Sequence, residues 1–431
     1  MKRNTINIIS LGCSKNLVDS ERLIRQLQAN GYIVVHNPDV VDADIAVVNT
    51  CGFISDAQEE SINTILQLGQ AKREGRIKRL YVMGCLAERF MAQLIDELPE
   101  VDKFYGKFNW NQLLSDLGKI YRHELEHERF LTTPPHYTYL KISEGCNRFC
   151  AFCAIPLITG RHKSVPIPQL LKEVETLTAK GVKEFNVIAQ DLSSYGKDLY
   201  GRLALPELIE QMAAIPGVEW IRLHYAYPTE FPYGILPVMA QHPKVCSYLD
   251  IALQHISDKV LDNMQRHISK AETLVLIDRL RREVPNLHLR TTLMVGFPGE
   301  GEKEYQELLD FVRDAQFERM GAFAYSEEDG TYAAKHLTDD TPAAVKQQRL
   351  QQLMELQEQI SLDIQQQKVG QTLRVIIDRE EDDYYIGRTE WDSPEVDPEV
   401  LIDKDKPLRI GEFYEVAITE AMPFELYGSV K

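Results

Sequence analysis

Strand-like and helix-like segments alternate along most of this chain, and this alternation limits the possible folds more than any other feature. Residues 4–121 contain the strand candidates Ile6–Leu11, Tyr32–Val35, Ile45–Asn49 and Leu80–Met83. The helical patterns that follow them cover Asn16–Ala29, Asp56–Gln70 and Ala87–Glu97. Such alternation produces a parallel sheet with helices on its faces. We therefore predict a doubly wound parallel α/β domain for residues 4–121.

The same rhythm resumes after a polar linker, Arg122–Pro135, and defines a second domain at residues 132–365. Its strand candidates are Tyr139–Ile142, Glu184–Ala189, Trp220–Tyr225, Tyr248–Leu253, Leu289–Val295 and Gly321–Ala324. Six strand–helix units form either an open sheet or an incomplete barrel. Their spacing alone does not decide between the two.

A long helix is predicted from Pro342 to Lys368. Thr341 suits its N-cap, Pro342 its first position, and Gly370 the stop that follows it. An apolar stripe along this helix is expected to pack on the preceding domain: Leu350, Leu353, Met354, Leu356 and Ile360.

The tail, residues 366–431, has a different pattern. Apolar residues alternate with polar ones, as at Leu373, Val375 and Ile377, and turns rich in Gly, Pro and Asp separate the segments. This pattern is typical of short β-strands and predicts a small all-β barrel or sandwich.

The charge and hydropathy of the chain limit its partners. The formal net charge of −17 argues against stable nucleic-acid binding, which requires many Lys and Arg side chains. A basic protein partner suits an acidic enzyme better. No run of 18 apolar residues and no secretory signal is present, so we expect a cytoplasmic protein without membrane contact.

Three of the seven cysteines form a compact run, with Cys146, Cys150 and Cys153 spaced Cys-x3-Cys-x2-Cys. An odd number of cysteines in a cytosolic chain does not indicate a disulfide framework. Three close thiolates can bind one face of a 4Fe–4S cluster and leave one iron open for a ligand.

Two other interpretations of this run are possible. A zinc site would need a fourth ligand, and His162 is the one nearby candidate. The spacing also fits one apolar face of a helix, although Gly145 and Asn147 suit a helix poorly. Both alternatives are less consistent with the sequence than a cluster site.

Cys13, Cys51 and Cys85 are far apart in the chain but share one local context. Each ends a predicted strand, precedes a predicted helix and has a glycine neighbour, namely Gly12, Gly52 and Gly84. The carboxyl ends of parallel strands meet at one edge of a sheet, so three cysteines there can converge on a second cluster. The glycines would let the backbone approach the cluster closely.

The alternative for this group is three unrelated buried cysteines, a common environment for Cys. Cys246 lacks the shared context, and we expect it to pack in the core.

With both groups, the chain is similar to the methylthiotransferase family of radical S-adenosylmethionine (SAM) enzymes. The matching segments are LGCSKNLVDSE, VVNTCGFI, GCLAER, EGCNRFCAFCAIPLITGRHKS and MVGFPGE. The resemblance covers essentially the whole chain. It implies a methylthiotransferase N-terminal domain at 4–121, a partial (βα)6 radical SAM barrel at 132–365, and a TRAM barrel at 366–431.

One branch of that family modifies an aspartate of small-subunit ribosomal protein twelve, and the other modifies an adenosine in transfer RNA. The chain resembles the aspartate branch in NVIAQDLSSYG, IRLHYAYP, YLDIALQHIS, LRTTLMVGFPGE, AYSEEDGTYA and GRTEWDSPEVD. The resemblance therefore implies conversion of an aspartyl residue to β-methylthio-aspartyl, with the transfer-RNA adenosine activity as the alternative. Two positions depart from the family pattern: Ser14 replaces a common proline, and Ser164–Val165–Pro166 lacks the usual arginine before the proline.

The resemblance also implies two 4Fe–4S clusters and SAM as cofactors. The cluster on Cys146, Cys150 and Cys153 would bind SAM, take one electron from an external low-potential donor and generate a 5′-deoxyadenosyl radical. That radical would remove hydrogen from the β-carbon of the aspartate. The cluster on Cys13, Cys51 and Cys85 would supply sulfur, and a second SAM the methyl group. No catalytic residue beyond these ligands is predicted, and the substrate is the ribosomal protein, free or in its subunit.

Four further residues are candidates for contact with the cofactor. Gly296, Gly299 and Glu300 end a predicted strand, where an ordinary strand-to-helix turn is the alternative. Gln190 lies at a strand's carboxyl end beside Asp191, where barrel enzymes place functional groups. A helix cap or a polar loop pair is equally consistent with those two residues.

Charged and histidine side chains complete the candidates. Arg290 is expected either to pair with a carboxylate or to be exposed, and His224 and His255 are expected to be structural. The acidic segment Glu390–Glu399 is predicted either to dock the basic substrate protein or to form a solvated loop. Its docking carboxylates would be Asp392, Glu395, Asp397 and Glu399.

Overall fold

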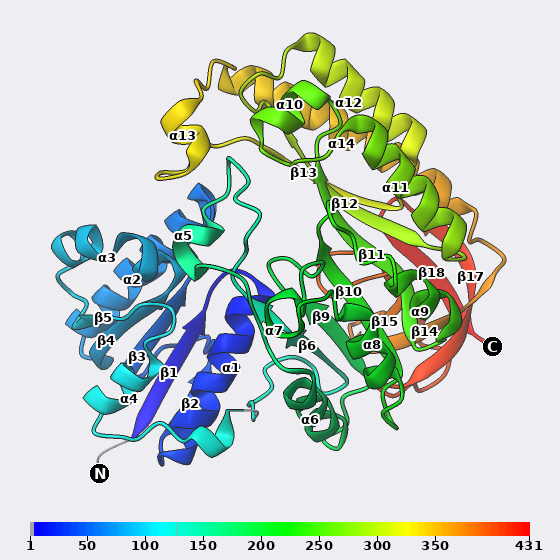
Figure 1. The fold of residues 1–431 in the computed structure, drawn as a ribbon. Helices are drawn as coiled ribbons and strands as arrows, with labels where there is room; N and C mark the ends of the chain where they lie inside the picture. The colour runs from blue at the N-terminus through cyan, green and yellow to red at the C-terminus, as the bar shows by residue number, and fades with distance from the viewer. Residues whose placement is uncertain (1–3, 127) are drawn as a thin grey trace.

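The N-terminal domain of this computed structural model is a parallel sheet in the order β2–β1–β3–β4–β5 (Figure 1). The structure describes residues 4–126 and 128–431. The strands are β1 (Thr5–Ser10), β2 (Ile33–His36), β3 (Ala43–Thr50), β4 (Ile77–Gly84) and β5 (Lys103–Phe104). The strand order reverses between β1 and β3, which confirms the doubly wound arrangement. The short β5 was not predicted, because a strand of two residues is too short to show an alternation of apolar and polar side chains.

Two helices cover each face of this sheet. Helices α1 (Ser14–Ala29) and α4 (Trp110–Asp116) pack on one face, and α2 (Ser55–Arg73) and α3 (Cys85–Glu97) on the other. Buried residues on α1 include Leu23, Ile24 and Leu27, whose spacing places them on one side of the helix. A short 3-10 helix (His123–Leu125) lies in the linker to the next domain.

The central domain is a six-stranded parallel sheet whose strands lie in chain order, β6–β9–β10–β11–β12–β13. Their bounds are β6 (Tyr137–Lys141), β9 (Glu184–Ile188), β10 (Trp220–Ala226), β11 (Val245–Gln254), β12 (His288–Val295) and β13 (Arg319–Ala324). Each strand neighbours the next one along the chain, as in a barrel, but β6 and β13 do not pair with each other. The sheet is therefore an incomplete barrel, the alternative that spacing alone left open.

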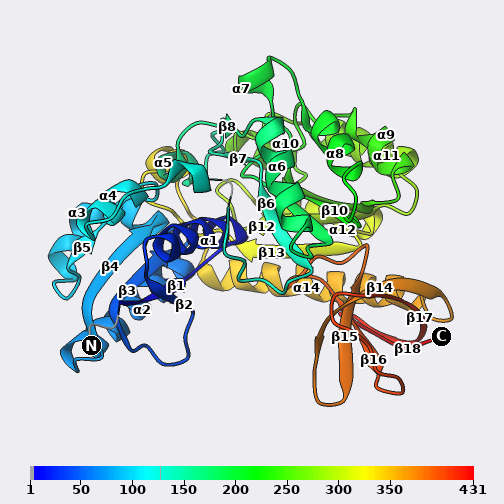
Figure 2. The same cartoon turned by 90° about the horizontal axis from the view of Figure 1, so that it is seen from below.

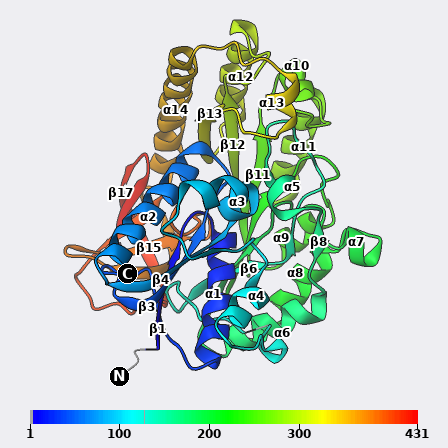
Figure 3. The same cartoon turned by 90° about the vertical axis from the view of Figure 1, so that its left-hand side faces the viewer.

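Helices cover the outer face of this sheet, as Figures 1 and 3 show. They are α6 (Ile167–Thr178), α8 (Leu205–Ala213), α9 (Ile235–Gln241), α11 (Lys270–Glu283) and α12 (Glu302–Ala315). Shorter elements lie in the loops: β7 (Ser143–Glu144), β8 (Lys163–Ser164), α5 (Ile155–Thr159), α7 (Lys197–Tyr200), α10 (Asp258–Asn263) and α13 (Tyr332–His336). Phe185, Val187, Ile221 and Leu223 face these helices in the main core. Because side chains alternate along a strand, the intervening positions face inward, and there many of them are polar.

Helix α14 (Ala343–Gln366) packs its apolar stripe on the central domain, as predicted. Leu353 and Ile360 are buried there. Thr341 was wrongly predicted as the N-cap: Pro342 occupies that position, and no side chain caps the helix. Gly370, with φ of +85°, follows the helix as expected, because glycine adopts this conformation without strain.

The tail is a closed barrel in the order β14–β15–β16–β18–β17 and not a sandwich. Its strands are β14 (Thr372–Glu380), β15 (Tyr384–Thr389), β16 (Glu399–Asp403), β17 (Phe413–Met422) and β18 (Glu425–Val430). Figure 2 shows this barrel beside the C-terminal end of α14. Among the described residues, no helix combines the length and apolar character needed to cross a membrane.

The acidic loop between β15 and β16 binds the inner face of the central barrel. Asp392 is buried against Arg319, with 2.5 Å between Oδ1 and Nη2. Asp397 pairs with Arg290, so Arg290 does meet a carboxylate. The docking prediction is therefore wrong for Asp392 and Asp397, because each carboxylate neutralises a buried arginine of the same chain.

The other two carboxylates of the proposed docking segment also have partners within the chain. Glu395 accepts hydrogen bonds from the hydroxyls of Tyr137 and Tyr139, at 3.3 and 3.4 Å. Glu399 pairs with Arg379 at the surface. The segment thus fastens the small barrel to the central domain.

Candidate functional site

Cys13, Cys51 and Cys85 lie at the carboxyl ends of three neighbouring strands. Cys51 and Cys85 directly follow β3 and β4, and Cys13 ends the short loop after β1. β3 pairs with both β1 and β4, so the three strand ends are adjacent. The Cys85 thiol interacts electrostatically with both other thiols, which shows that the three side chains converge as predicted.

The neighbouring glycines allow this convergence. A Cβ atom on Gly12 would lie 2.6 Å from Cβ of Cys51, and one on Gly84 would lie 2.6 Å from the Thr50 carbonyl oxygen. Both glycines have positive φ, +83° and +101°. The glycines thus let one strand end approach the next, which differs from the predicted approach of the backbone to a cluster.

A lysine accompanies this first triad of cysteines. Burial raises the pKa of Cys85 to about 12, and the nearby Lys107 opposes that rise. Lys107 is itself buried, and its Nζ lies 2.9 Å from Oε1 of Glu144 in the central domain. Glu144 precedes Cys146 by two residues, so Lys107 connects the two groups of cysteines.

Cys146, Cys150 and Cys153 lie in the loop after β7, and their thiols also interact with one another. Burial raises the pKa of Cys146 to about 12 and that of Cys153 still further. Helix α5, which begins two residues after Cys153, contacts α3, whose first residue is Cys85. The two triads therefore lie on facing elements of the two domains.

An arginine accompanies this second triad. Nη1 of Arg266 lies 3.4 Å from Sγ of Cys150, and the Tyr227 hydroxyl lies 3.5 Å from the same sulfur. His162, the possible fourth zinc ligand, instead contacts the Ser164 hydroxyl through Nε2 at 3.1 Å. Ser164, in the Ser164–Val165–Pro166 segment that lacks the family's usual arginine, also donates from its hydroxyl to Asp198 at 2.6 Å.

The donor set of each triad fits an iron–sulfur cluster. All six thiols are free, and each triad has a buried cation beside it that offsets thiolate charge. Cysteine binds metal as the thiolate. Burial disfavours a thiolate that has no positive charge beside it, and bound iron would supply that charge. In the described part of the chain, no three His, Cys, Asp or Glu side chains are placed around a single metal ion. A cubane cluster spreads its three thiolates more widely than a single ion does.

Polar acceptors without partners lie at the carboxyl ends of two central strands. Gln190 follows β9 and donates to Glu144, and its Oε1 is buried without a hydrogen-bond partner among the described residues. Oε1 of Gln254, at the end of β11, is in the same situation within that part of the chain. Buried acceptors of this kind suit a polar ligand such as SAM, which carries hydroxyl and amino donors.

The other sequence candidates have contacts within the protein. Both Glu300 carboxylate oxygens are engaged, since Oε2 meets His255 Nε2 at 3.1 Å and Oε1 accepts from Arg349 and the Gly296 amide. A Cβ on Gly296 would lie 2.4 Å from Lys346, and one on Gly299 would lie 2.4 Å from Asn263. Contact of these three residues with SAM stays a prediction.

Several structural assignments are confirmed. Asp191 accepts from Arg148 and Ser194, which matches its interpretation as part of a polar loop. His224 is buried beside Asn186, and burial lowers its pKa well below the usual value. Cys246 packs against aromatic and aliphatic side chains in the core.

Sequence reasoning missed Lys15, which lies two residues after Cys13. Its Nζ is 3.3 Å from the centre of the Tyr225 ring at the end of β10. The N-terminal domain thus reaches the mouth of the central barrel at this point. The segment LGCSKNLVDSE contains this lysine, but nothing in its spacing distinguishes it from a surface lysine.

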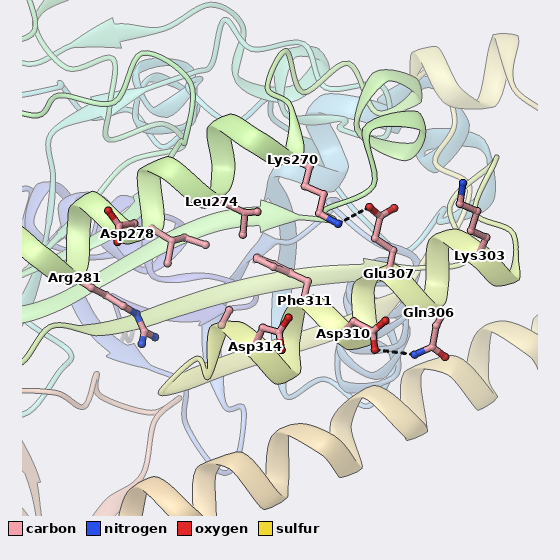
Figure 4. A pocket seen from close by; sticks show the side chains of 12 residues that line it. Lys270, Leu274, Asp278, Arg281, Lys303, Gln306, Glu307, Asp310, Phe311 and Asp314 are labelled. Carbon is pink, nitrogen blue, oxygen red and sulfur yellow. Dashed lines mark hydrogen bonds and ion pairs between the residues drawn. The ribbon is translucent and has the colours of Figure 1, made fainter.

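A groove of about 680 Å³ lies elsewhere, between α11 and α12 on the outside of the central domain (Figure 4). Lys270 pairs with Glu307 there, and the Gln306 side chain donates a hydrogen bond to Asp310. Its lining contains no cysteine, and it lies apart from the strand ends that carry the two triads.

Three protein-family models match separate segments of the chain. Residues 5–106 match the uncharacterized protein family UPF0004, residues 140–312 the radical SAM superfamily, and residues 369–430 the TRAM domain. Ribosomal protein uS12 methylthiotransferase RimO of Parabacteroides distasonis is 62% identical over 430 residues, covering 100% of both chains. RimO of Phocaeicola vulgatus is 63% identical over 431 residues, again with 100% of both covered.

A solved structure shares the fold at low identity. The radical SAM methyltransferase TsrM of Kitasatospora setae, with cobalamin and a 4Fe–4S cluster bound, superposes with a TM-score of 0.54. The match covers 75% of each chain at 13% identity.

Proposed function

The chain belongs to the RimO family of ribosomal protein uS12 methylthiotransferases, and we propose that it converts an aspartyl side chain of uS12 to β-methylthio-aspartyl. It is a radical SAM transferase that uses SAM and 4Fe–4S clusters. The observation that supports the reaction best is the pair of cysteine triads on facing elements, connected through Lys107 and Glu144.

In this proposal each triad holds one cluster. Cys146, Cys150 and Cys153 hold the cluster that binds SAM, and Cys13, Cys51 and Cys85 hold the other. When bound, the first cluster with SAM supplies a 5′-deoxyadenosyl radical, and the second supplies sulfur. The protein's own contribution is to place the substrate β-carbon between the two triads and to keep water away.

Named side chains carry out these tasks. Arg266 and Lys107 offset the negative charge that three thiolates bring to a buried site. Gln190 and Gln254 offer acceptors to SAM, and Gly296, Gly299 and Glu300 shape the turn beside it. We propose that the electron comes from an external low-potential donor.

The alternative substrate is an adenosine of transfer RNA. The net charge of −17 favours the basic ribosomal protein, because an RNA interface needs an excess of Lys and Arg. A substrate in the ribosome also implies a cytoplasmic enzyme.

The test uses anaerobically reconstituted holoenzyme with SAM, a sulfide source and a chemical reductant. Purified uS12 and unmodified transfer RNA are offered in separate reactions, and mass spectrometry follows both. We expect uS12 to gain a methylthio group at one aspartate and transfer RNA to stay unchanged. Modification of the RNA with unmodified uS12 would overturn the proposal.

A further inference from the structure

Lys15 is a largely buried residue whose ammonium group has no ion-pair partner in the described part of the chain. The residue is 8% exposed, and Nζ lies 3.3 Å from the centre of the Tyr225 ring. Asp250 is near enough to interact with Lys15 electrostatically, but the two form no ion pair. Nζ itself is not fully enclosed, so an anion from outside the protein can reach it and pair with it.

The neighbouring lysines at the domain interface are different. Lys141 is bound by Asp19 and Glu144, and Lys107 by Glu144 with Asp19 nearby. Those two ammonium groups are neutralised by carboxylates of the chain. Lys15 therefore stands out by its missing partner and not by its charge.

Lys15 also lies in the first turn of α1. This turn contains no acidic residue, and the N-cap Cys13 offers no side-chain cap. Unpaired backbone N–H groups at a helix N-terminus carry partial positive charge and attract anions. The partial positive charge of this helix end thus adds to the charge of an ammonium group that belongs to the same turn.

The mouth of the central barrel is built to present this place. Tyr225, whose ring lies under Nζ, has φ of +62°, a left-handed conformation that a tyrosine rarely adopts. Its amide donates to Oδ2 of Asp250 at 3.3 Å, which holds the strained residue in position. The strain keeps the ring at the edge where the N-terminal domain meets the barrel.

We propose that Lys15 and the N-terminus of α1 bind the side-chain carboxylate of the substrate aspartate. This inference rests on the proposed function and names the group that recognises its substrate. The reacting β-carbon is bonded directly to that carboxylate. Lys15 is two residues from Cys13, and its Nζ lies at the end of β10, so a carboxylate held here lies where the domain of the first triad meets the central barrel.

The test measures discrimination between aspartate and asparagine. Affinity of the holoenzyme with SAM is measured for uS12 and for a uS12 variant with asparagine at the modified position. The wild-type enzyme should bind the aspartate form about 10- to 100-fold more tightly, as expected for a charge-assisted hydrogen bond. Lys15→Gln should bind both forms equally, and Lys15→Arg should restore most of the preference.

Controls separate recognition from folding. Lys78→Gln removes the same charge from the surface of the same domain and should keep the full preference. Thermal unfolding of Lys15→Gln is measured beside the wild type, because a loss of structure would lower the midpoint of unfolding.

Two outcomes would overturn the inference. One is a wild-type enzyme that binds both forms equally, a result that needs no variant to fold. The other is a Lys15→Gln enzyme that keeps the aspartate preference. A wild-type enzyme that does not modify uS12 at all would instead reject the proposed function.

Discussion

Nη1 of Arg266 lies 3.4 Å from the sulfur of Cys150, and further contacts hold the guanidinium in this position. The guanidinium stacks 4.1 Å from the centre of the Tyr227 ring and donates through Nη2 to the Ala252 carbonyl. Gln265 and His267, on either side of it, both have positive φ. The buried guanidinium is thus held against one thiol of the second triad by a backbone segment in which two residues adopt the strained left-handed conformation.

Replacement of Arg266 by methionine should make the reduction potential of the adjacent cluster more negative. Reduction adds negative charge, and the guanidinium favours that charge. We expect a shift of about 60 mV or more, which corresponds to a tenfold change for a one-electron couple. Redox titration followed by electron paramagnetic resonance measures it, with Arg282→Met on the surface of α11 as the control. An unchanged potential would contradict the role assigned to Arg266.

Replacement of Lys107 by methionine should weaken the cluster of the first triad and spare that of the second. Lys107 offsets charge at Cys85, whereas Glu144 keeps Lys141 as a second partner. The experiment uses a background in which Cys146, Cys150 and Cys153 are alanine, so that all bound iron reports on the first triad. We expect less iron and sulfide per protein when Lys107→Met is added. Equal iron in both proteins would show that Lys107 serves only the domain interface.

The sequence predicted those parts of the site that depend on local pattern. Cys13, Cys51 and Cys85 follow strands, and strand ends of a parallel sheet must meet, so their convergence could be derived. Lys15 could not be found in this way. Its significance is the missing counter-ion beside Tyr225, and that depends on how two domains pack against each other.

The acidic loop between β15 and β16 gives the converse case, in which charges that look available in the sequence are neutralised in the fold. Asp392 and Asp397 have the composition of a docking surface, but their partners Arg319 and Arg290 lie on strands of another domain. Sequence pattern reveals the charge of a residue, and only the fold shows whether that charge is already neutralised.

Replacement of Asp392 by asparagine should therefore destabilise the protein and leave the affinity for uS12 unchanged. Removal of one partner of a buried ion pair costs about 3–5 kcal/mol, because Arg319 would stay buried and unpaired. Although burial opposes it, Arg319 and Lys368 lower the pKa of Asp392 to about 2. The contribution of Asp392 to stability is thus complete above about pH 4 and is lost as the pH falls toward 2. Thermal unfolding and binding measurements on the same variant distinguish this role from docking.

Replacement of Lys368 by methionine should stabilise the protein at neutral pH. Burial, aided by Arg319, lowers the pKa of Lys368 from 10.5 to about 7, although Asp392 and Glu318 act in the opposite direction. The unfolded chain therefore binds more protons than the folded chain between about pH 7 and 10. The burial of Lys368 thus opposes folding at neutral pH, and this penalty decreases as the pH rises. At pH 7 the variant should gain about 1–4 kcal/mol, and the gain should vanish toward pH 10.

The measurement is the difference in unfolding free energy between the variant and the wild type across that pH range, which cancels the titration of other groups. Lys404→Met, at the surface of the same barrel, is the control and should show no such trend. The His288 ring beside Lys368 gives a second readout, because this lysine contributes to the lowered pKa of His288. That pKa should rise in the variant, and a gain in stability without this rise would mean that better packing, and not the lost charge, is responsible.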